Sequence, residues 1–353
     1  MKRKFILPLA SSLMITAIFI SSCNKAELPV DNSQLRENIL SNSANNVCLA
    51  SYQDMYNKTQ QLLTAVNTLN TSTTDENLNA ARQLWKDTRT TWEKSEAWLF
   101  GPVSSDNIDP RIDTWPVDFN SLDSILATTN TLNEAYVNGL DDALKGFHPI
   151  EYLLWGQNGN KAASAFTDRE KEYLLALATN LNTLAKEVKD SWENGYAQQL
   201  ESAGNGSTEY ATKVDAFSEM VDAMAGICDE VANGKIKDPY DQQDPTLEES
   251  PFAKNSITDF TNNILGVMNM YQGNFLKDGN GIEDLVRTYN LSLDNDIKTA
   301  HAAAIASLNA ITVPFGEAIL TQQTQVQNAM VKINALKDIL EKRLVPFVMQ
   351  YGE

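Results

Sequence analysis

Apolar residues recur every three or four positions along most of the chain, which is the period of amphipathic helices. The first two such series comprise Tyr52, Met55, Tyr56, Thr59, Leu62, Leu63, Val66 and Leu69, and then Leu78, Ala81, Leu84, Trp85, Thr88, Trp92, Ser95 and Leu99. Further helices are predicted over 174–192, 214–231, 256–271, 293–310 and 321–344, with a short one from Gly281. Because no segment alternates apolar and polar residues convincingly, the sequence predicts an all-α fold in which strands are absent or trivial.

Residues that begin, end or interrupt helices indicate how the helices are grouped. Thr167 and Glu170 have the spacing of a capping box, and Asn233-Gly234 ends a helix. Residues 237–245 are polar and contain two prolines, which places a domain boundary there. Since single helices cannot bury their apolar faces alone, we expect two packed bundles of about four main helices each. Their predicted ranges are 45–236 and 237–353.

The N-terminal half is interrupted by residues 101–120, a stretch that contains Pro110, Pro116 and several aspartates. Long loops within compact bundles are more often functional or disordered than incidental. The acidic residues together with Trp115 favour an ordered loop with a function.

The first 22 residues have the form of a signal peptide, with a basic start and an apolar stretch of 16 residues from Phe5 to Ile20. That stretch is too short for a membrane-spanning helix. It ends in Ser21-Ser22-Cys23, which is typical of a bacterial lipobox, so Cys23 is the predicted lipidation site and 23–44 a flexible tether. Asn24 favours the outer membrane. An ordinary cleaved signal peptide with a chance cysteine is the alternative.

The net charge of −18 argues against nucleic acid or an anionic lipid surface as a partner. It is compatible with a cationic ligand, although acidity alone decides little. Besides Cys23 the chain has two cysteines, Cys48 and Cys228. An even pair in an oxidising compartment predicts either a disulfide between them or two free buried thiols, and the sequence does not choose.

Only two histidines are present, and one of them has a promising neighbourhood. His301 has no acidic residue within the next helical turn and is interpreted as a surface or boundary residue. His148 precedes Pro149, which predicts a helix that begins at Pro149 with His148 at its cap. Glu151 is then the third helical residue, so imidazole and carboxylate would form a ligand pair for iron or zinc. Alternatively, Glu151 only caps backbone N–H groups.

Other carboxylates would complete such a site. Glu93 and Glu96 are three residues apart on a predicted helix, so their side chains are neighbours. Four aspartates follow in the loop: Asp106, Asp109, Asp113 and Asp118. Helical bundles commonly hold iron between carboxylates and histidines of facing helices. The alternative for Glu93 and Glu96 is an exposed, solvated helix face.

These residues occur within blocks that resemble the imelysin-like family. The stretch 146–156 resembles its Gly-x-His-x-x-Glu signature. Further blocks with the expected order are Trp92-Glu93-x-x-Glu96, Phe100-Gly101-Pro102, Ile108-Asp109, Trp115-Pro116, Glu249-Ser250-Pro251-Phe252, Asp259-Phe260, Asn263-Ile264, Tyr271 and Gly281-Ile282. The resemblance covers about residues 45–350. One departure is Pro149, where the family more often has alanine.

The resemblance implies two helical bundles that face each other, with the His-x-x-Glu motif near their junction. It assigns the metal ligands to His148, Glu151, Glu93, Glu96 and Asp109. The family includes iron-regulated envelope proteins and periplasmic parts of iron-uptake systems, and it also carries a peptidase label. We therefore expect an outer-membrane lipoprotein, on the periplasmic or the surface face, that binds iron, with zinc as the alternative. Its partners would be a metal ion or chelate and an envelope transport protein.

Two other functions are compatible with the sequence. The first is an interaction protein without metal. The second is a zinc peptidase, which is disfavoured because the chain has no His-Glu-x-x-His motif and offers one site histidine. Serine nucleophiles find no support either, since no Gly-x-Ser-x-Gly is present. We thus predict no catalytic residues, and haem is disfavoured because only His148 is a plausible axial histidine.

Overall fold

The computed structural model describes residues 32–353, which form one compact unit. Regular structure in this range is helical throughout and contains no strand, which confirms the all-α prediction. The predicted signal peptide and the predicted lipidation site at Cys23 lie outside the described residues. None of the helices within 32–353 combines the length and the apolarity that crossing a membrane requires. The proposed boundary near residue 237 stays a prediction.

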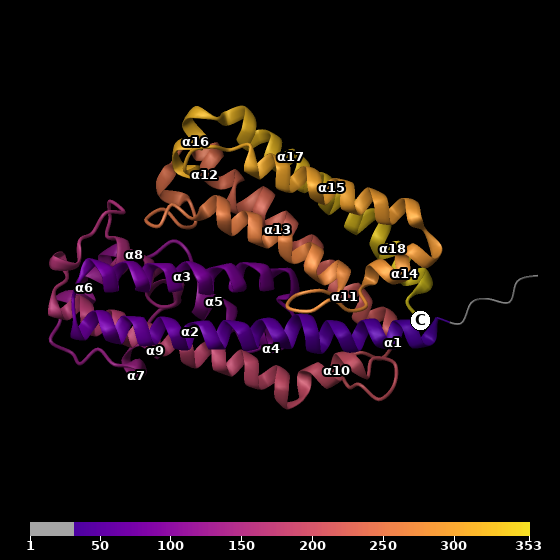
Figure 1. Ribbon diagram of the computed structural model, residues 1–353, viewed down its shortest axis with the longest axis horizontal. Helices are drawn as coiled ribbons and strands as arrows, with labels where there is room; N and C mark the ends of the chain where they lie inside the picture. Colours follow the sequence, from indigo (N-terminus) through magenta and orange to yellow (C-terminus); the bar gives the residue numbers. More distant parts are fainter. Residues whose placement is uncertain (1–31) are drawn as a thin grey trace, which may run out of the picture. The chain divides into compact units, whose positions relative to one another are not determined.

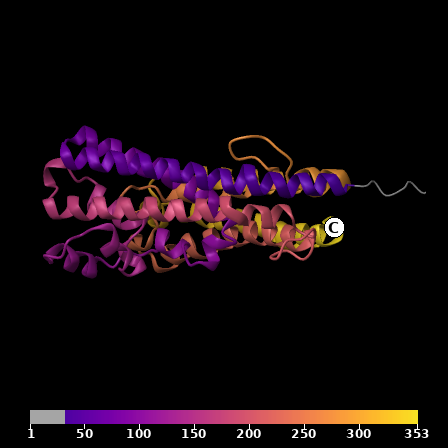
Figure 2. The same ribbon diagram turned by 90° about the horizontal axis from the view of Figure 1, so that it is seen from below.

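The N-terminal two thirds of the chain contain four long helices and several short ones. Their bounds are α1 Ser33–Asn42, α2 Ala50–Thr71, α3 Asp75–Ser95, α4 Pro102–Ser105, α5 Asp109–Asp113, α6 Phe119–Ala127, α7 Glu134–Asn138, α8 Phe147–Trp155, α9 Asp168–Ser191, α10 Ala197–Glu201 and α11 Lys213–Glu230. Helix α2 packs against both α3 and α9, as Figures 1 and 2 show. The apolar side chains on the facing sides of these helices are fully buried, among them Leu62, Val66 and Leu177.

The C-terminal third adds a second group of helices. These are α12 Lys237–Gln242, α13 Ser256–Gln272, α14 Ile282–Tyr289, α15 Leu291–Asn309, α16 Phe315–Thr321, α17 Gln323–Ile339 and α18 Val345–Tyr351. Helix α15 packs on α17 and α13, and α17 also packs on α11. The predicted helices thus match observed ones with ends displaced by a few residues, and the capping box of Thr167 and Glu170 on α9 is confirmed.

Helices α3 and α13 pack along each other and join the two groups (Figure 1). Their backbones come very close at Gly266, where an added Cβ would lie 2.2 Å from the carbonyl oxygen of Lys94. A side chain at this position would push the helices apart, because real Cβ atoms do not approach that closely. The absence of a side chain at Gly266 therefore lets the polar residues of α3 and α13 meet.

The segment predicted as a flexible tether is helical from Ser33, so that prediction was wrong for residues 33–44. Helix α1 continues through a π-helical turn, η1 (Ser43–Leu49), into α2. Ile39 and Leu40 are fully buried, and Arg36 Nε donates a hydrogen bond to the carbonyl of Tyr351 at 2.6 Å. The apolar pattern here is short and surrounded by polar residues, and its burial depends on distant parts of the chain.

Two segments predicted to lie between the main helices contain short helices of their own. Residues 237–245 were expected to be an irregular break, but they contain α12 and lead into a 3-10 turn, η7 (Pro245–Leu247). Pro239 is tolerated because it lies in the first turn of α12, where backbone N–H groups lack helical partners. The loop at 101–120 contains α4 and α5, so it is a structured element as predicted.

Cys48 and Cys228 are free and buried, so the structure contradicts the disulfide and supports the alternative of two thiols. The surroundings of the two residues differ: Cys48 lies near Tyr52 and Tyr196, whereas Cys228 lies near Lys337. Burial raises the pKa of both thiols above the ordinary range. Neither is therefore a thiolate at neutral pH, and both serve as small apolar core residues.

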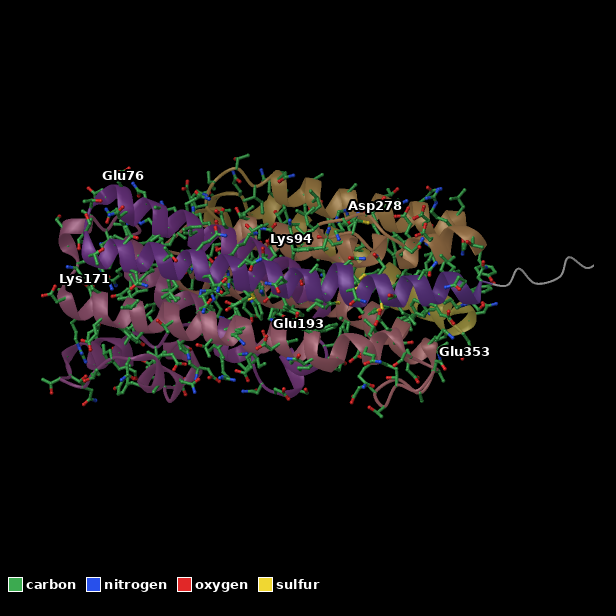
Figure 3. All side chains as sticks on the ribbon, turned by 60° about the horizontal axis from the view of Figure 1, so that its bottom comes forward. Glu76, Lys94, Lys171, Glu193, Asp278 and Glu353 are labelled. Carbon is green, nitrogen blue, oxygen red and sulfur yellow. The ribbon has the colours of Figure 1, made fainter. Side chains whose placement is uncertain are left out.

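Charged residues are distributed between the surface and an unusual interior cluster. The exposed outer faces carry residues such as Glu76, Glu193 and Asp278, whose side chains point into solvent (Figure 3). The interior set comprises Arg89, Glu93, Glu96, Asp113, His148, Glu151, Glu249 and Asp259, whose side chains are all buried. Buried charges are rare unless they are paired or bind a ligand, so this cluster is the candidate functional site.

Candidate metal centre

Arg89, in the middle of α3, lies at the centre of the buried cluster. Its guanidinium forms ion pairs with Glu93 one turn later and with Asp113 of α5. It also contacts Glu249 at 2.5 Å, in the turn before α13, and Asp259 of α13 at 3.7 Å. Burial disfavours the charged guanidinium, but the four carboxylates outweigh this cost and hold the pKa of Arg89 above its usual value. Arg89 is thus a permanent cation that joins three parts of the chain.

Lys235 is the second cation of the cluster. It ends a π-helical turn, η6 (Val231–Lys235), that follows α11. Its Nζ lies 2.8 Å from Glu96 Oε2 and 2.9 Å from Glu249 Oε1, with Glu93 Oε2 at 3.6 Å and Glu230 Oε1 at 3.7 Å. Unlike Arg89, its side chain is 12% exposed.

The predicted neighbours Glu93 and Glu96 do lie together, and they are buried, which excludes the exposed-face alternative. The amide Nδ2 of Asn263 on α13 donates to Glu93 Oε2 at 2.7 Å and to Glu96 Oε2 at 2.5 Å. Burial raises the pKa of Glu93 to about 7 even though Arg89 and Lys235 favour its ionised form. Burial and the adjacent Glu93 also raise the pKa of Glu96. Protons or another cation are therefore readily taken up by this pair.

Helix α8 brings His148 into the cluster, although the helix begins at Phe147, two residues before the predicted start. Pro149 is accommodated as the third helical residue, where a backbone N–H would have no helical partner anyway. His148 Nε2 lies 3.0 Å from Asp113 Oδ1, and Nδ1 lies 3.5 Å from Glu151 Oε2. The ring is fully buried and packs against Trp115, with ring centroids 4.9 Å apart.

The nitrogen Nε2 of His148 has no hydrogen-bond partner among the described residues, because its contact with Asp113 is short but poorly aligned. Burial favours the neutral imidazole. The contacts with Asp113 and Glu151 nevertheless outweigh burial and raise the pKa of His148 to about 9.

Glu151 is held by backbone groups of the C-terminal part. Its Oε1 accepts hydrogen bonds from the N–H groups of Phe252 at 3.0 Å and Ala253 at 2.7 Å. The expected alternative, in which Glu151 caps backbone N–H groups, thus describes one of its oxygens, but the capped segment is not its own helix. Only Oε2 faces His148.

Asp109 lies on the wall of a cavity beside the cluster. The cavity has a volume of about 350 Å³ and is lined mainly by Glu96, Asp109, Asp113, Trp115, Glu230, Lys235, Asp238, Leu247 and Glu249. Burial, with the nearby Asp113 and Glu230 charges, raises the pKa of Asp109 to about 7. The cavity borders the buried cluster, and several acidic groups of the cluster form part of its wall.

Within residues 32–353, two sets of three side chains are close enough to share one metal ion. Asp113, His148 and Glu249 form one set, and Glu93, Glu96 and Asp113 form the other. Within each set the ligand atoms lie within 4.8 Å of one another. The structure therefore gathers His148, Glu93 and Glu96 as expected, whereas Asp109 and Glu151 lie beside these sets rather than within them.

Sequence reasoning missed several members of the cluster: Arg89, Lys235, Glu249, Asp259 and Asn263, and it passed over Asp113 in favour of Asp109. A signal existed for Arg89, because it lies on the same helical face as Trp85 and Trp92. A charged residue within an apolar stripe indicates a buried counter-charge.

Gly146 is the residue that allows α8 to approach α5. Its φ is +82°, and an added Cβ would lie 2.1 Å from the carbonyl oxygen of Ile112, next to Asp113. We expect Gly146→Ala to lower the free energy of unfolding by at least about 2 kcal/mol, measured by urea denaturation. The matched control is Gly139→Ala, since Gly139 has negative φ and nothing closer than 3.6 Å. Equal stability of the two variants would contradict this role.

The residues 48–343 match the model of the imelysin family. The chain belongs to this family. A relative, the iron-regulated protein A of Synechococcus elongatus, is 29% identical over 342 residues, which cover 94% of this chain and 91% of that protein. The match confirms the resemblance drawn from the Gly-x-His-x-x-Glu segment. The family model is also designated peptidase family M75.

Two solved structures have the same fold as this imelysin-family chain. One, from Parabacteroides distasonis, is assigned as an iron-regulated protein A precursor; it is 24% identical, covers 87% of this chain and 94% of its own, and has a TM-score of 0.81. The other is an imelysin-like protein from Psychrobacter arcticum, 12% identical over 90% of this chain and 96% of its own, with a TM-score of 0.72. Imelysin-family members thus keep this helical arrangement at low sequence identity.

Proposed function

We propose that this protein binds an iron ion for iron acquisition or homeostasis at the cell envelope, and that Asp113, His148 and Glu249 hold the ion. One observation carries the proposal. His148 Nε2 and Glu249 Oε2 are both buried and make no hydrogen bond in the described chain, and ligand atoms of these two residues and of Asp113 lie within 4.8 Å of one another. A buried polar atom without a hydrogen bond costs about 1–3 kcal/mol, so these two atoms indicate a position where a ligand binds.

The chemistry of these donors fits the ion. One imidazole nitrogen and two carboxylates are typical ligands of iron, and they also accept zinc. Glu151 supports the site from outside, since its contact with Nδ1 favours a proton there and makes Nε2 the nitrogen that would bind metal once it loses its own proton. Glu93 and Glu96 form the neighbouring set with Asp113. The name of the Synechococcus relative, iron-regulated protein A, favours iron over zinc.

The charge of the cluster favours a bare or hydrated cation over an anionic chelate. Six carboxylates lie within ion-pair distance of only two permanent cations, Arg89 and Lys235, which leaves a formal charge of −4 when all are ionised. The cavity wall adds Asp109 and Asp238. Such a field attracts cations and repels anions.

The proposed location follows from the N-terminal sequence. A lipid at Cys23 would anchor the protein to the outer membrane, and an envelope transport protein would exchange the ion with it. Peptidase chemistry is not part of the proposal. Both oxygens of Glu151 are engaged, one by two backbone N–H groups and one by His148, so the carboxylate of the His-x-x-Glu motif is not free to act as a general base.

Calorimetric titration of the metal-stripped protein with Fe(II), without oxygen, and with Zn(II) tests the proposal. We expect one ion per chain at micromolar affinity or better, weakened at least about tenfold by His148→Ala and by Glu249→Gln. His301→Ala is the matched control, since the Nε2 of the other histidine already contacts the carbonyl of Ile264 at 3.1 Å. If the wild type binds no ion, an interaction protein becomes the better description.

A further inference from the structure

The ammonium group of Lys235 already occupies the side of the cluster that an incoming cation would approach. It lies 2.9 Å from Glu249 Oε1, and the other oxygen of the same carboxylate, Oε2, is the unpartnered one. It also contacts Glu96 at 2.8 Å and lines the cavity. A metal ion bound by Glu249 would therefore lie close to a positive charge held by the same carboxylate.

We propose that Lys235 is a tethered counter-ion that holds the carboxylates in the metal-free protein and is displaced toward the cavity mouth when the metal binds. This inference rests on the proposed metal site. It assigns Lys235 a role distinct from that of Arg89, the other cation of the cluster, and it makes metal binding an exchange of one cation for another.

Arg89 is not able to leave in this way. Its guanidinium is fully buried in the middle of α3 and is shared by four carboxylates. Lysine carries a compact charge on a flexible stem, whereas the planar guanidinium is fixed by several directed bonds. Lys235 is also partly exposed to the cavity, and it ends a π-helical turn, an irregularity that is frequent at functional sites.

An alternative partner for the displaced ammonium is at hand. Glu230 Oε1 lies 3.7 Å from Nζ, and the Glu230 side chain is 54% exposed at the cavity. Asp238 lines the same cavity and lies three residues after Lys235. Rotation about the side-chain bonds of Lys235 would exchange Glu249 and Glu96 for these groups without movement of the helices. The return of the lysine would in turn assist release of the ion.

Lys235→Met tests the inference by removal of the competing charge while the length of the side chain is kept. We expect Zn(II) and anaerobic Fe(II) to bind this variant at least about tenfold more tightly than the wild type, because no like charge opposes them. The matched control is Lys237→Met, two residues away, since Lys237 is exposed and pairs only with Asp241. Its affinity should equal that of the wild type.

A second measurement uses the unaltered protein. Acetylation of lysines, followed by mass spectrometry, is compared with and without saturating Zn(II). We expect Lys235 to react several-fold faster when the metal is bound, because its ammonium is then at the cavity mouth, while the reactivity of Lys237 is unchanged. This measurement decides the matter if Lys235→Met does not fold.

The outcomes separate this inference from the proposed function. If the wild type binds metal but Lys235→Met binds no more tightly and acetylation of Lys235 is not accelerated, the inference is overturned and the metal site stands. If only Lys235→Met binds metal, the lysine is not displaced in the wild type, and both the exchange and the proposed function are overturned. If neither binds Zn(II) or Fe(II), the proposed function fails and this inference fails with it.

Discussion

Arg89→Met is expected to lower the free energy of unfolding by about 3–5 kcal/mol at pH 7, the cost of breaking a buried ion pair by removal of one partner. Methionine fills much of the same space but leaves Glu93, Asp113, Glu249 and Asp259 without their common counter-charge. Urea denaturation measures the loss. Arg287→Met is the control, because Arg287 is 54% exposed and its pairing with Glu283 at 3.4 Å is a surface ion pair.

The loss caused by Arg89→Met should shrink at lower pH. Burial already raises the pKa of Glu93 to about 7 and that of Asp259 above its usual value, so both become neutral more readily than free carboxylates. Once they are protonated, fewer buried charges require Arg89. A loss at pH 7 no greater than that of Arg287→Met would mean that the carboxylates are neutral in the folded protein and that Arg89 is not their common partner.

The affinity for metal is expected to rise roughly tenfold per pH unit between pH 6 and pH 8, about 100-fold in all. The sign follows from His148, whose pKa is about 9 in the folded protein. Below that pH the imidazole carries a proton on the nitrogen that would bind metal, so each bound ion must displace this proton. Glu93, with a pKa of about 7, steepens the dependence at the acidic end if its proton is also released.

Competition titrations with Zn(II) at pH 6, 7 and 8 measure this dependence, and calorimetry in buffers of different ionisation enthalpy counts the protons released. His148→Ala should bind more weakly and show a shallower slope, since one of the displaced protons is gone. The same slope in wild type and His148→Ala would show that Nε2 is not a ligand.

Periodicity was sufficient to predict the long helices because α2, α3, α9 and α13 each bury a stripe that repeats over several turns. It failed for α1, where the stripe is short. It also misplaced the start of α8, which follows Gly146, a residue with positive φ and no room for a Cβ beside the backbone of Ile112. Tertiary contacts of this kind leave no local pattern.

The candidate site was predicted in part. His148, Glu93 and Glu96 were found, and Asp109 was chosen one helical turn away from Asp113, which is the residue that contacts the histidine. Arg89 and Glu249, which lie 160 residues apart in sequence, were not connected. Spacing along a chain reports neighbours on one helix, whereas the charge balance of this cluster is set by residues from distant parts of the sequence.

The hydrogen bonds of Glu151 also bear on the stage of folding at which the proposed metal ligands come together. They reach 101 and 102 residues ahead to Phe252 and Ala253, and Asn263 reaches back 170 residues to Glu93. Loops of this size close only after much of the chain has collapsed. A chain that emerges with its N-terminus first presents Asp113 and His148 long before Glu249, so the set of Asp113, His148 and Glu249 stays incomplete until the last third of the chain has folded.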